Sequence, residues 1–146
     1  MVSESFILYI ISMEKTNPLN VAALDGIEYT QQDVDYFLCG AFEGGSNYWV
    51  DFYEKGISCR EEIEFFWEAV TRNGTIFIYH GSEEGEENKT ELTLPMLVQG
   101  LEMFFSKYFE KEKNKNKKLT FDFVDLDADD SDLFLQYSLF GEEVYC

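Results

Sequence analysis

The first apolar pattern with helical spacing follows Thr30. Thr30 is a typical N-cap residue, and Asp33 lies in the first turn, where an acidic side chain is favourable. The apolar positions recur with a period near 3.6 residues, and they are Val34, Phe37, Leu38 and Ala41. Gly44-Gly45 supplies a stop signal. The pattern therefore predicts a helix that begins after Thr30 and ends at these two glycines.

Two further helical patterns follow, each with its own start signal. Ser58 and Glu61 have the spacing of a capping box, and Gly74 stands after the segment as a stop signal. The apolar face of this second predicted helix consists of Ile63, Phe66, Trp67 and Val70. The third predicted helix starts near Leu94, with Pro95 tolerated in its first turn. Its apolar positions are Leu97, Leu101, Phe104, Phe105 and Tyr108.

A last helix is predicted from about Ala128 to Phe140, closed by Gly141. Asp127, Asp129 and Asp130 stand at its start. Carboxylates at this position accept hydrogen bonds from free backbone N–H groups and match the positive end of the helix dipole. Capping is therefore the preferred role for these three aspartates.

Strands are predicted where aromatic and β-branched residues gather between turn signals. The segments are residues 5–12, Tyr48–Tyr53, Thr75–His80, Lys89–Thr93 and Leu119–Val124. The third and fourth of them form a β-hairpin around the loop Gly81–Asn88. Helices mixed with a largely antiparallel sheet define the α+β class, so we predict about four helices packed on a small sheet.

The length of 146 residues fits a single domain, which we expect to span residues 1–146. Hydrophobic residues make up 45% of the chain, which is enough to fill a core. Met13 is a second candidate start. With that start, residues 1–12 would be an upstream extension, and the sequence leaves both starts open.

Acidic residues dominate the charge. Asp and Glu number 29 against 11 Lys and Arg, for a formal net charge of −18. Six of the basic residues fall between Lys107 and Lys118. Duplex DNA carries one charge per roughly 1.7 Å, so this charge corresponds to about 30 Å of duplex, close to the span of such a domain. We expect the protein to present a duplex-like charge to a partner with a basic groove and not to bind nucleic acid itself. The simpler interpretation is that acidity maintains solubility.

Cysteine usage and hydropathy suggest the compartment. Cys39, Cys59 and Cys146 are odd in number and widely spaced, which favours reduced thiols over a disulfide framework. The apolar run Phe6–Ile11 is too short to cross a membrane and lacks the basic flank of a signal peptide. We expect a cytoplasmic protein without membrane contact.

The sequence predicts no enzyme. His80 is the only histidine, so any Ser-His-Asp or Cys-His arrangement would have to use it. Neither Cys39 nor Cys59 has the sequence context of a known nucleophile. We therefore expect no catalytic residue and no cofactor.

A metal site is a weaker alternative. Asp125, Asp127 and Asp129 alternate as in an EF-hand loop. Asp130 stands where that loop needs Gly, and Gln136 stands where it needs a bidentate Glu. Because both diagnostic positions fail, we predict no metal ligand. A metal-dependent enzyme that uses these aspartates remains the third hypothesis for the function.

Acidic and aromatic residues are the candidates for contact with a partner. A rigid hairpin is a good platform for contacts, and its loop is rich in Glu. Adjacent aromatic pairs such as Phe65-Phe66 and Phe104-Phe105 are too many for one helix face, which leaves a homo-oligomer open. The full candidate set is Glu83, Glu84, Glu86, Glu87, Asp125, Asp127, Asp129, Asp130, Asp132, Tyr48 and Trp49.

Two stretches carry a family resemblance. One is Glu43-Gly44-Gly45-Ser46-Asn47-Tyr48-Trp49. The other runs from Asp127-Ala128-Asp129-Asp130-Ser131-Asp132 through Leu135-Gln136-Tyr137 and Leu139-Phe140-Gly141-Glu142 to Val144-Tyr145. Together with the helix start in Leu92–Leu101, they resemble a group of small acidic proteins carried by phages and prophages of bacteria. The resemblance implies a viral accessory protein that acts in a bacterial cytoplasm, and it assigns no residue roles.

Charge and phage context together favour a counter-defence inhibitor of the anti-CRISPR type. Such a protein would block the basic nucleic-acid channel of its target by stoichiometric binding, with electrostatic steering to speed capture. The alternative is a phage accessory or assembly module without a defence target, oligomeric through its surplus aromatic residues.

Overall fold

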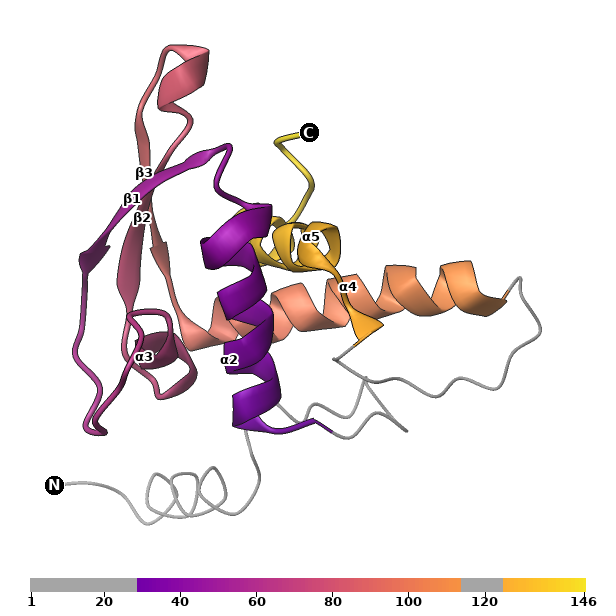
Figure 1. Ribbon diagram of the computed structural model, residues 1–146, viewed down its shortest axis with the longest axis horizontal. Helices are drawn as coiled ribbons and strands as arrows, with labels where there is room; N and C mark the ends of the chain where they lie inside the picture. The colour runs from indigo at the N-terminus through magenta and orange to yellow at the C-terminus, as the bar shows by residue number, and fades with distance from the viewer. Residues whose placement is uncertain (1–28, 114–124) are drawn as a thin grey trace, which may run out of the picture.

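The computed structural model describes residues 29–113 and 125–146, and their arrangement is shown in Figure 1. In these residues four α-helices accompany a three-stranded antiparallel sheet of order β1-β2-β3, which confirms the α+β class. The strands predicted at 5–12 and at Leu119–Val124 lie outside the described residues. The elements are α2 (Gln31–Gly40), β1 (Val50–Lys55), α3 (Glu68–Thr71), β2 (Ile76–His80), β3 (Asn88–Leu92), α4 (Leu94–Lys113) and α5 (Ala128–Phe140).

Helix α2 begins at the predicted cap. The Thr30 side chain accepts a hydrogen bond from Asp33 N at 3.1 Å, and the Asp33 carboxylate accepts one from Thr30 N at 2.8 Å. The α-helical part ends at Gly40 and widens into the π-helical turn η2 (Ala41–Gly45). The helical segment as a whole therefore ends at the predicted glycines.

The predicted helix from Ser58 does not form, and α3 covers only Glu68–Thr71 with no side-chain cap. Residues 57–59 instead run beside the start of β2. Ile57 N donates to Thr75 Oγ1 at 2.7 Å, and Thr75 N donates to Ile57 O at 2.8 Å. The prediction of a Ser58–Glu61 capping box was wrong because these contacts between distant segments outweigh the local helix signal.

The sheet follows the predicted hairpin within one residue at each boundary. Strand β2 pairs with β3 from Ile76↔Leu92 to His80↔Asn88. Strand β1 pairs with the other side of β2, with a bulge between Val50 and Phe52. It begins after the predicted Tyr48 because residues 46–49 form a turn, in which Trp49 N donates to Ser46 O at 3.1 Å.

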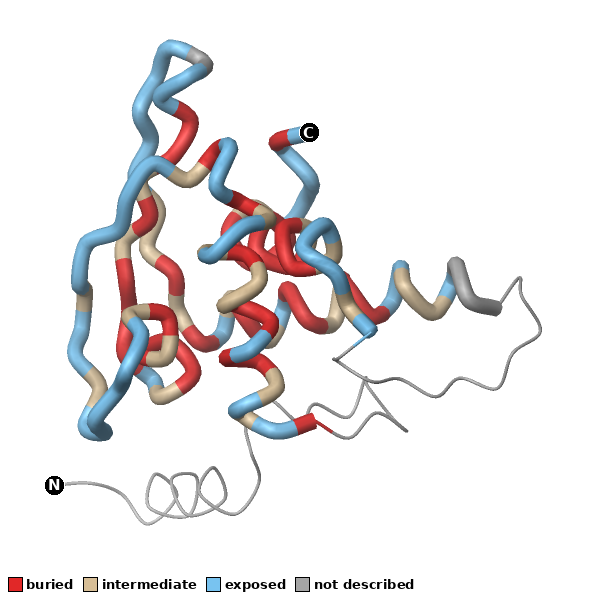
Figure 2. The backbone as a smooth tube through the Cα atoms, in the orientation of Figure 1, coloured by how far each residue is buried: buried red, intermediate tan, exposed pale blue. Residues whose placement is uncertain are grey.

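The core lies where α2, α4 and α5 meet and along one face of β2 (Figure 2). Phe37 of α2 stacks on Phe134 of α5 with ring centroids 4.4 Å apart and meets Phe104 of α4 edge-on at 5.1 Å. Phe104 and Phe105 are both buried. The Phe105 ring lies 6.4 Å from the ring of Tyr29, so this adjacent pair adds no exposed aromatic surface, whereas Phe65 of the other pair is 42% exposed.

Candidate functional site

Two stretches singled out in the sequence, residues 43–49 and 127–145, meet in space around Asp132, in the second turn of α5. Its carboxylate is only 9% exposed and accepts four hydrogen bonds. Oδ1 accepts from Ser46 Oγ at 2.8 Å and from Trp49 Nε1 at 2.6 Å. Oδ2 accepts from Tyr48 OH at 2.7 Å and from Gln136 Nε2 at 3.2 Å. Asp132 thus joins the turn before β1 to α5.

Gln136, one turn further along α5, holds the C-terminal segment. Its Oε1 accepts from the backbone N of Val144 and of Tyr145, each at 2.7 Å, and its Nε2 donates to Tyr145 O at 3.0 Å. The Tyr145 ring then stacks on Trp49 with centroids 4.9 Å apart. One carboxylate and one amide therefore fix three segments that are far apart in the sequence.

His80 continues this network into the sheet. It is 5% exposed. Its Nδ1 lies 2.9 Å from Tyr145 OH, and its Nε2 lies 2.9 Å from Thr90 Oγ1. Burial lowers the pKa of the imidazole, against a smaller opposing effect of the Asp51 carboxylate. Because both ring nitrogens have hydroxyl partners, His80 links β2 to β3 and to the C-terminal segment.

Two residues predicted for the partner surface lie in the interior. Trp49 is 3% exposed, and the polar atoms of Trp49 and Asp132 bond to each other. We therefore remove both from the contact surface. Tyr48 is 45% exposed. Burial of its hydroxyl and the bond to Asp132 raise the pKa of Tyr48 far above the ordinary range.

The aspartates at the start of α5 act as the predicted cap. The Asp127 side chain accepts from Asp130 N at 2.9 Å, and the Asp130 side chain accepts from Asp127 N at 3.1 Å. Asp125 and Asp129 are exposed. Within residues 29–113 and 125–146, no group of three His, Cys, Asp or Glu side chains is placed to hold a metal ion.

The acidic loop of the hairpin has an anchored base. The short 3₁₀ turn η3 (Ser82–Glu84) lies between Gly81 and Gly85, whose φ angles of 82° and 99° favour glycine. Ser82 donates from both N and Oγ to the Asp51 carboxylate of β1, the backbone bond measuring 3.1 Å. Gly81 N also donates to Trp49 O at 3.1 Å. These bonds hold the loop against β1.

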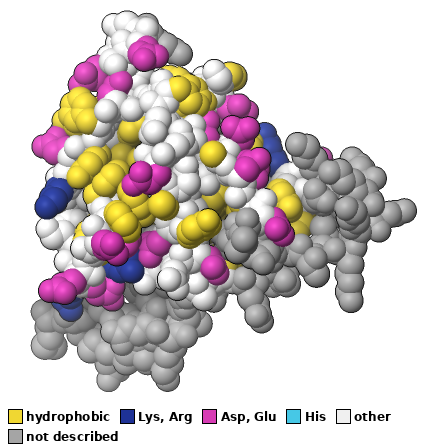
Figure 3. Space-filling model, in the orientation of Figure 1, with side chains coloured by type: hydrophobic (Ala, Val, Ile, Leu, Met, Phe, Trp, Pro, Cys, Tyr) yellow, Lys and Arg dark blue, Asp and Glu magenta, His cyan; other side chains and the backbone are white. Residues whose placement is uncertain are grey.

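The acidic tip is the glutamate cluster of this loop, Glu83, Glu86 and Glu87 together with Glu84. The first three are exposed, and none of them belongs to the four ion pairs among the described residues. On the face shown in Figure 3, acidic side chains lie at the hairpin end and over much of the remaining surface. The tip therefore presents unneutralised charge.

The structure joins some candidates and separates others. A shallow pocket of about 210 Å³ at the hairpin base is lined by Tyr48, Asp51, Glu83, Tyr145 and Cys146, among others. Asp127 instead lines a different hollow, together with Tyr36 and Glu43. Figure 1 shows the hairpin tip well apart from the start of α5. The predicted acidic surface is thus two surfaces, and only the hairpin surface includes Tyr48.

Sequence reasoning missed the residues that build the network. Ser46, Gln136 and Tyr145 lie in the resembling stretches but were given no role. Asp132 and Gln136 are four residues apart, at the same helical spacing that places Leu135 and Leu139 in the core. That spacing was the available signal for an inward-facing polar pair.

Comparisons of the chain with models of protein families, with curated proteins and with solved structures found no match. In the described part of the chain, no helix combines the length and the apolar character needed to span a bilayer.

Proposed function

We propose that this protein is a phage-encoded inhibitor that binds the basic groove of a nucleic-acid-binding protein through its acidic tip. In the phage setting that the resemblance implies, the role is counter-defence, of the anti-CRISPR type. The observation that carries the proposal is the exposure of Glu83, Glu86 and Glu87 on a loop whose base is bonded to β1.

An anchored loop suits stoichiometric binding. Because Asp51 and the two positive-φ glycines already fix the backbone of η3, little conformational entropy is lost when the tip docks. Clustered like charges also raise the rate of encounter with a basic partner. The half-exposed Tyr48 lines the same pocket as Glu83 and offers an aromatic contact next to the tip.

The test is a pull-down from hosts that carry defined CRISPR effectors, combined with a plaquing panel in the same hosts. The binding variant replaces Glu83, Glu84, Glu86 and Glu87 with Gln. The control variant removes the same charge at exposed positions away from the tip, by Gln at Glu43, Glu62, Glu64 and Glu110. We expect capture of a basic nuclease and restored plaquing, both lost in the tip variant and kept in the control. If no effector is inhibited and no basic nuclease is captured, the proposal fails.

Exposed aromatic residues favour a second candidate, a phage accessory or assembly module. Phe52 is 50% exposed, Tyr53 43% and Phe65 42%, so these aromatic side chains are accessible to a partner. Capture of a phage protein in the same pull-down, with binding unaffected by the tip variant, would favour this function over inhibition.

A further inference from the structure

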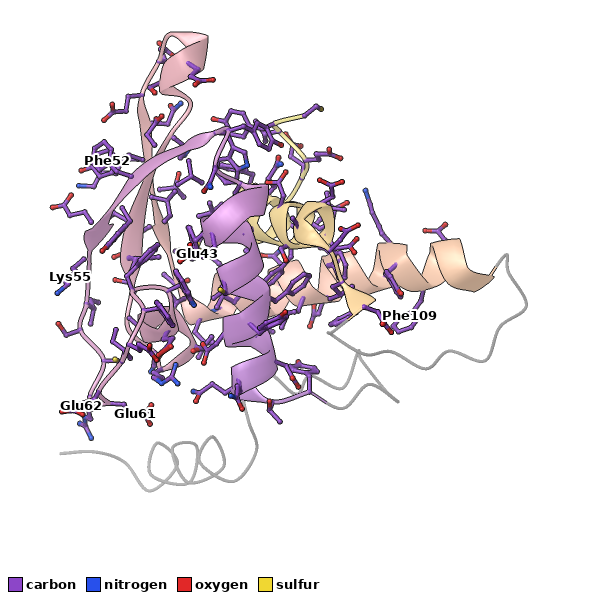
Figure 4. The ribbon with its side chains drawn as sticks, viewed as in Figure 1. Glu43, Phe52, Lys55, Glu61, Glu62 and Phe109 are labelled. Carbon is purple, nitrogen blue, oxygen red and sulfur yellow. The ribbon has the colours of Figure 1, made fainter. Side chains whose placement is uncertain are left out.

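Among the described residues, strand β1 has no partner on one of its two sides. In the described sheet it pairs only with β2, and residues 51–55 are all exposed. Phe52 and Lys55 point away from the body of the molecule (Figure 4). An exposed edge strand with aromatic side chains is a template for pairing with another strand.

The pairing with β2 decides which backbone groups are available on this edge. Gly56 N donates to Thr75 O at 3.0 Å, and residues 52–55 continue the same antiparallel register along β2. In an antiparallel ladder, alternate residues direct N–H and C=O to the same neighbour. The backbone N–H and C=O groups of residues 52, 54 and 56 therefore point to β2. Those of Tyr53 and Lys55 point to the open edge.

The charges of β1 are self-complementary in one register. If two copies pair antiparallel about an axis at Tyr53, Asp51 of each copy lies opposite Lys55 of the other. An axis at Glu54 or at Lys55 would place like charges opposite each other, which is unfavourable. An axis at Phe52 would extend the pairing into the turn at residues 46–49 and leave the charges of β1 unmatched.

Both members of that charge pair are available. Lys55 is exposed and takes part in none of the four ion pairs among the described residues. Asp51 is exposed as well, at the bulge of β1, and its carboxylate also accepts two hydrogen bonds from Ser82. Two-fold symmetry would form the pair twice.

Basic side chains accompany the acidic ones on this side of the molecule. Basic residues of the described segments outside α4 all lie in β1, in β3 or between β1 and β2, and they are Lys55, Arg60, Arg72 and Lys89. The start of α5 lies elsewhere, whereas Ser82 at the base of the acidic tip is bonded to Asp51 of β1. An interface at β1 therefore includes basic side chains that offset part of the repulsion between two acidic copies.

We propose that this chain forms a two-fold symmetric dimer in which β1 of each copy pairs antiparallel with β1 of the other, centred on Tyr53. The two sheets then join in the order β3-β2-β1-β1-β2-β3, with aromatic side chains of both copies at the junction. Because the strands are antiparallel, the two acidic tips lie at opposite ends of the joined sheet. The dimer does not depend on the target of the tip.

The test is sedimentation of the full chain, without any target, from micromolar to hundreds of micromolar concentration at physiological salt. We expect the mass to approach twice the 17.1 kDa of one chain as concentration rises. Lys55→Asp places two acidic residues opposite each other and should raise the dissociation constant roughly tenfold or more. The double variant Asp51→Lys with Lys55→Asp should restore dimerisation. Arg60→Asp, with the same change of charge at an exposed site outside β1, is the control and should have a smaller effect.

A disulfide provides an independent test if the Asp51 variant does not fold. In a background with the natural cysteines replaced by Ser, Tyr53→Cys should join two copies, because residues facing each other across strands are within disulfide reach. With the axis at Tyr53, residue 54 of one copy does not lie opposite residue 54 of the other. Glu54→Cys should therefore form far less of the intermolecular disulfide. A protein that stays monomeric throughout overturns the proposal. The proposal is also overturned if Arg60→Asp raises the dissociation constant as much as Lys55→Asp does. It is overturned as well if the double variant stays dissociated.

Discussion

Asp132 is a buried carboxylate that belongs to none of the four ion pairs among the described residues. Its charge is instead met by four neutral donors, from Ser46, Tyr48, Trp49 and Gln136. An ionised carboxylate has only acceptor positions, so it suits a site in which every neighbour donates. The residue therefore stabilises the fold through the hydrogen bonds that its oxygens accept, which compensate for the burial of the carboxylate.

Asp132→Asn tests this role. The variant keeps the size of the side chain but directs an NH₂ group toward donors, and Gln136 cannot turn to accept because its oxygen already serves the C-terminal segment. We expect a loss of about 1–3 kcal/mol in the free energy of unfolding, measured by urea denaturation. Asp125→Asn, at an exposed site before the same helix, should cost much less. Equal stability of the two variants would contradict the role assigned to Asp132.

His80 gives a prediction on pH. Burial holds the imidazole pKa below its ordinary value of 6.5, so between that value and the folded pKa the unfolded chain binds more protons. Its stabilising contribution is therefore present above pH 6.5 and is lost as the pH falls through the folded pKa. The chain has one histidine, so a proton NMR titration reads this pKa without overlap. The stability advantage of the natural protein over His80→Gln should shrink over the same range. A pKa at or above 6.5 would contradict the prediction.

At the scale of elements, two adjacent glycines have different roles. A Cβ on Gly45 would collide with Ala128 O of α5, whereas a Cβ on Gly44 would meet nothing within 4 Å. Gly45 therefore permits η2 to approach the start of α5 closely, and Gly44 does not.

Gly45→Ala should destabilise the protein by about 1–3 kcal/mol, because either η2 or α5 must move. Gly44→Ala should be close to neutral and serves as the matched control. Thermal unfolding of both variants measures the difference. If the Gly45 variant unfolds at the temperature of the Gly44 variant, the close approach between η2 and α5 is not required for stability.

The elements that the sequence predicted best are those with signals at both ends. Helix α5 has a capping pair at Asp127 and Asp130 and a left-handed Gly141 after its last residue, and its predicted bounds are confirmed. The helix expected at Ser58 had comparable local signals. It failed because Thr75, distant in sequence, holds Ile57 by two hydrogen bonds. Such a contact leaves no mark in a local pattern.

The sequence predicted correctly those candidate residues whose exposure follows from their residue type. Glutamates in a hairpin loop are nearly always solvated, so Glu83, Glu86 and Glu87 were placed correctly on the surface. The same rule misplaced Asp132, because neutral donors from segments far away in the sequence compensate its burial. The division of the acidic residues into two surfaces also depends on tertiary structure alone.

At the scale of the whole molecule, the net charge of −18 would govern association with the basic partner that we propose. The screening length falls from about 10 Å at 0.1 M salt to about 3 Å at 1 M, so we expect affinity to fall as salt rises. The variant with Gln at Glu83, Glu84, Glu86 and Glu87 should slow association more than it speeds dissociation. Its stability should scarcely change, because exposed charges contribute little. Surface plasmon resonance over a salt series measures both rates.

The control with Gln at Glu43, Glu62, Glu64 and Glu110 separates the tip from the overall charge. If it slows association as much as the tip variant does, the charge acts without a defined contact. Affinity indifferent to salt and to both variants would move the contact to aromatic residues, with Tyr48 the first to replace.

The position of the C-terminal segment bears on how such experiments are built. Gln136 and His80 hold Tyr145 in place, so Cys146 lies at the rim of the pocket that also includes Glu83. An affinity tag fused after Cys146 would emerge beside the glutamates of the hairpin. Such a tag would hinder the approach of a bulky target without disturbing the fold. The tagged protein would then fail to bind, and this result could be mistaken for the lack of a partner.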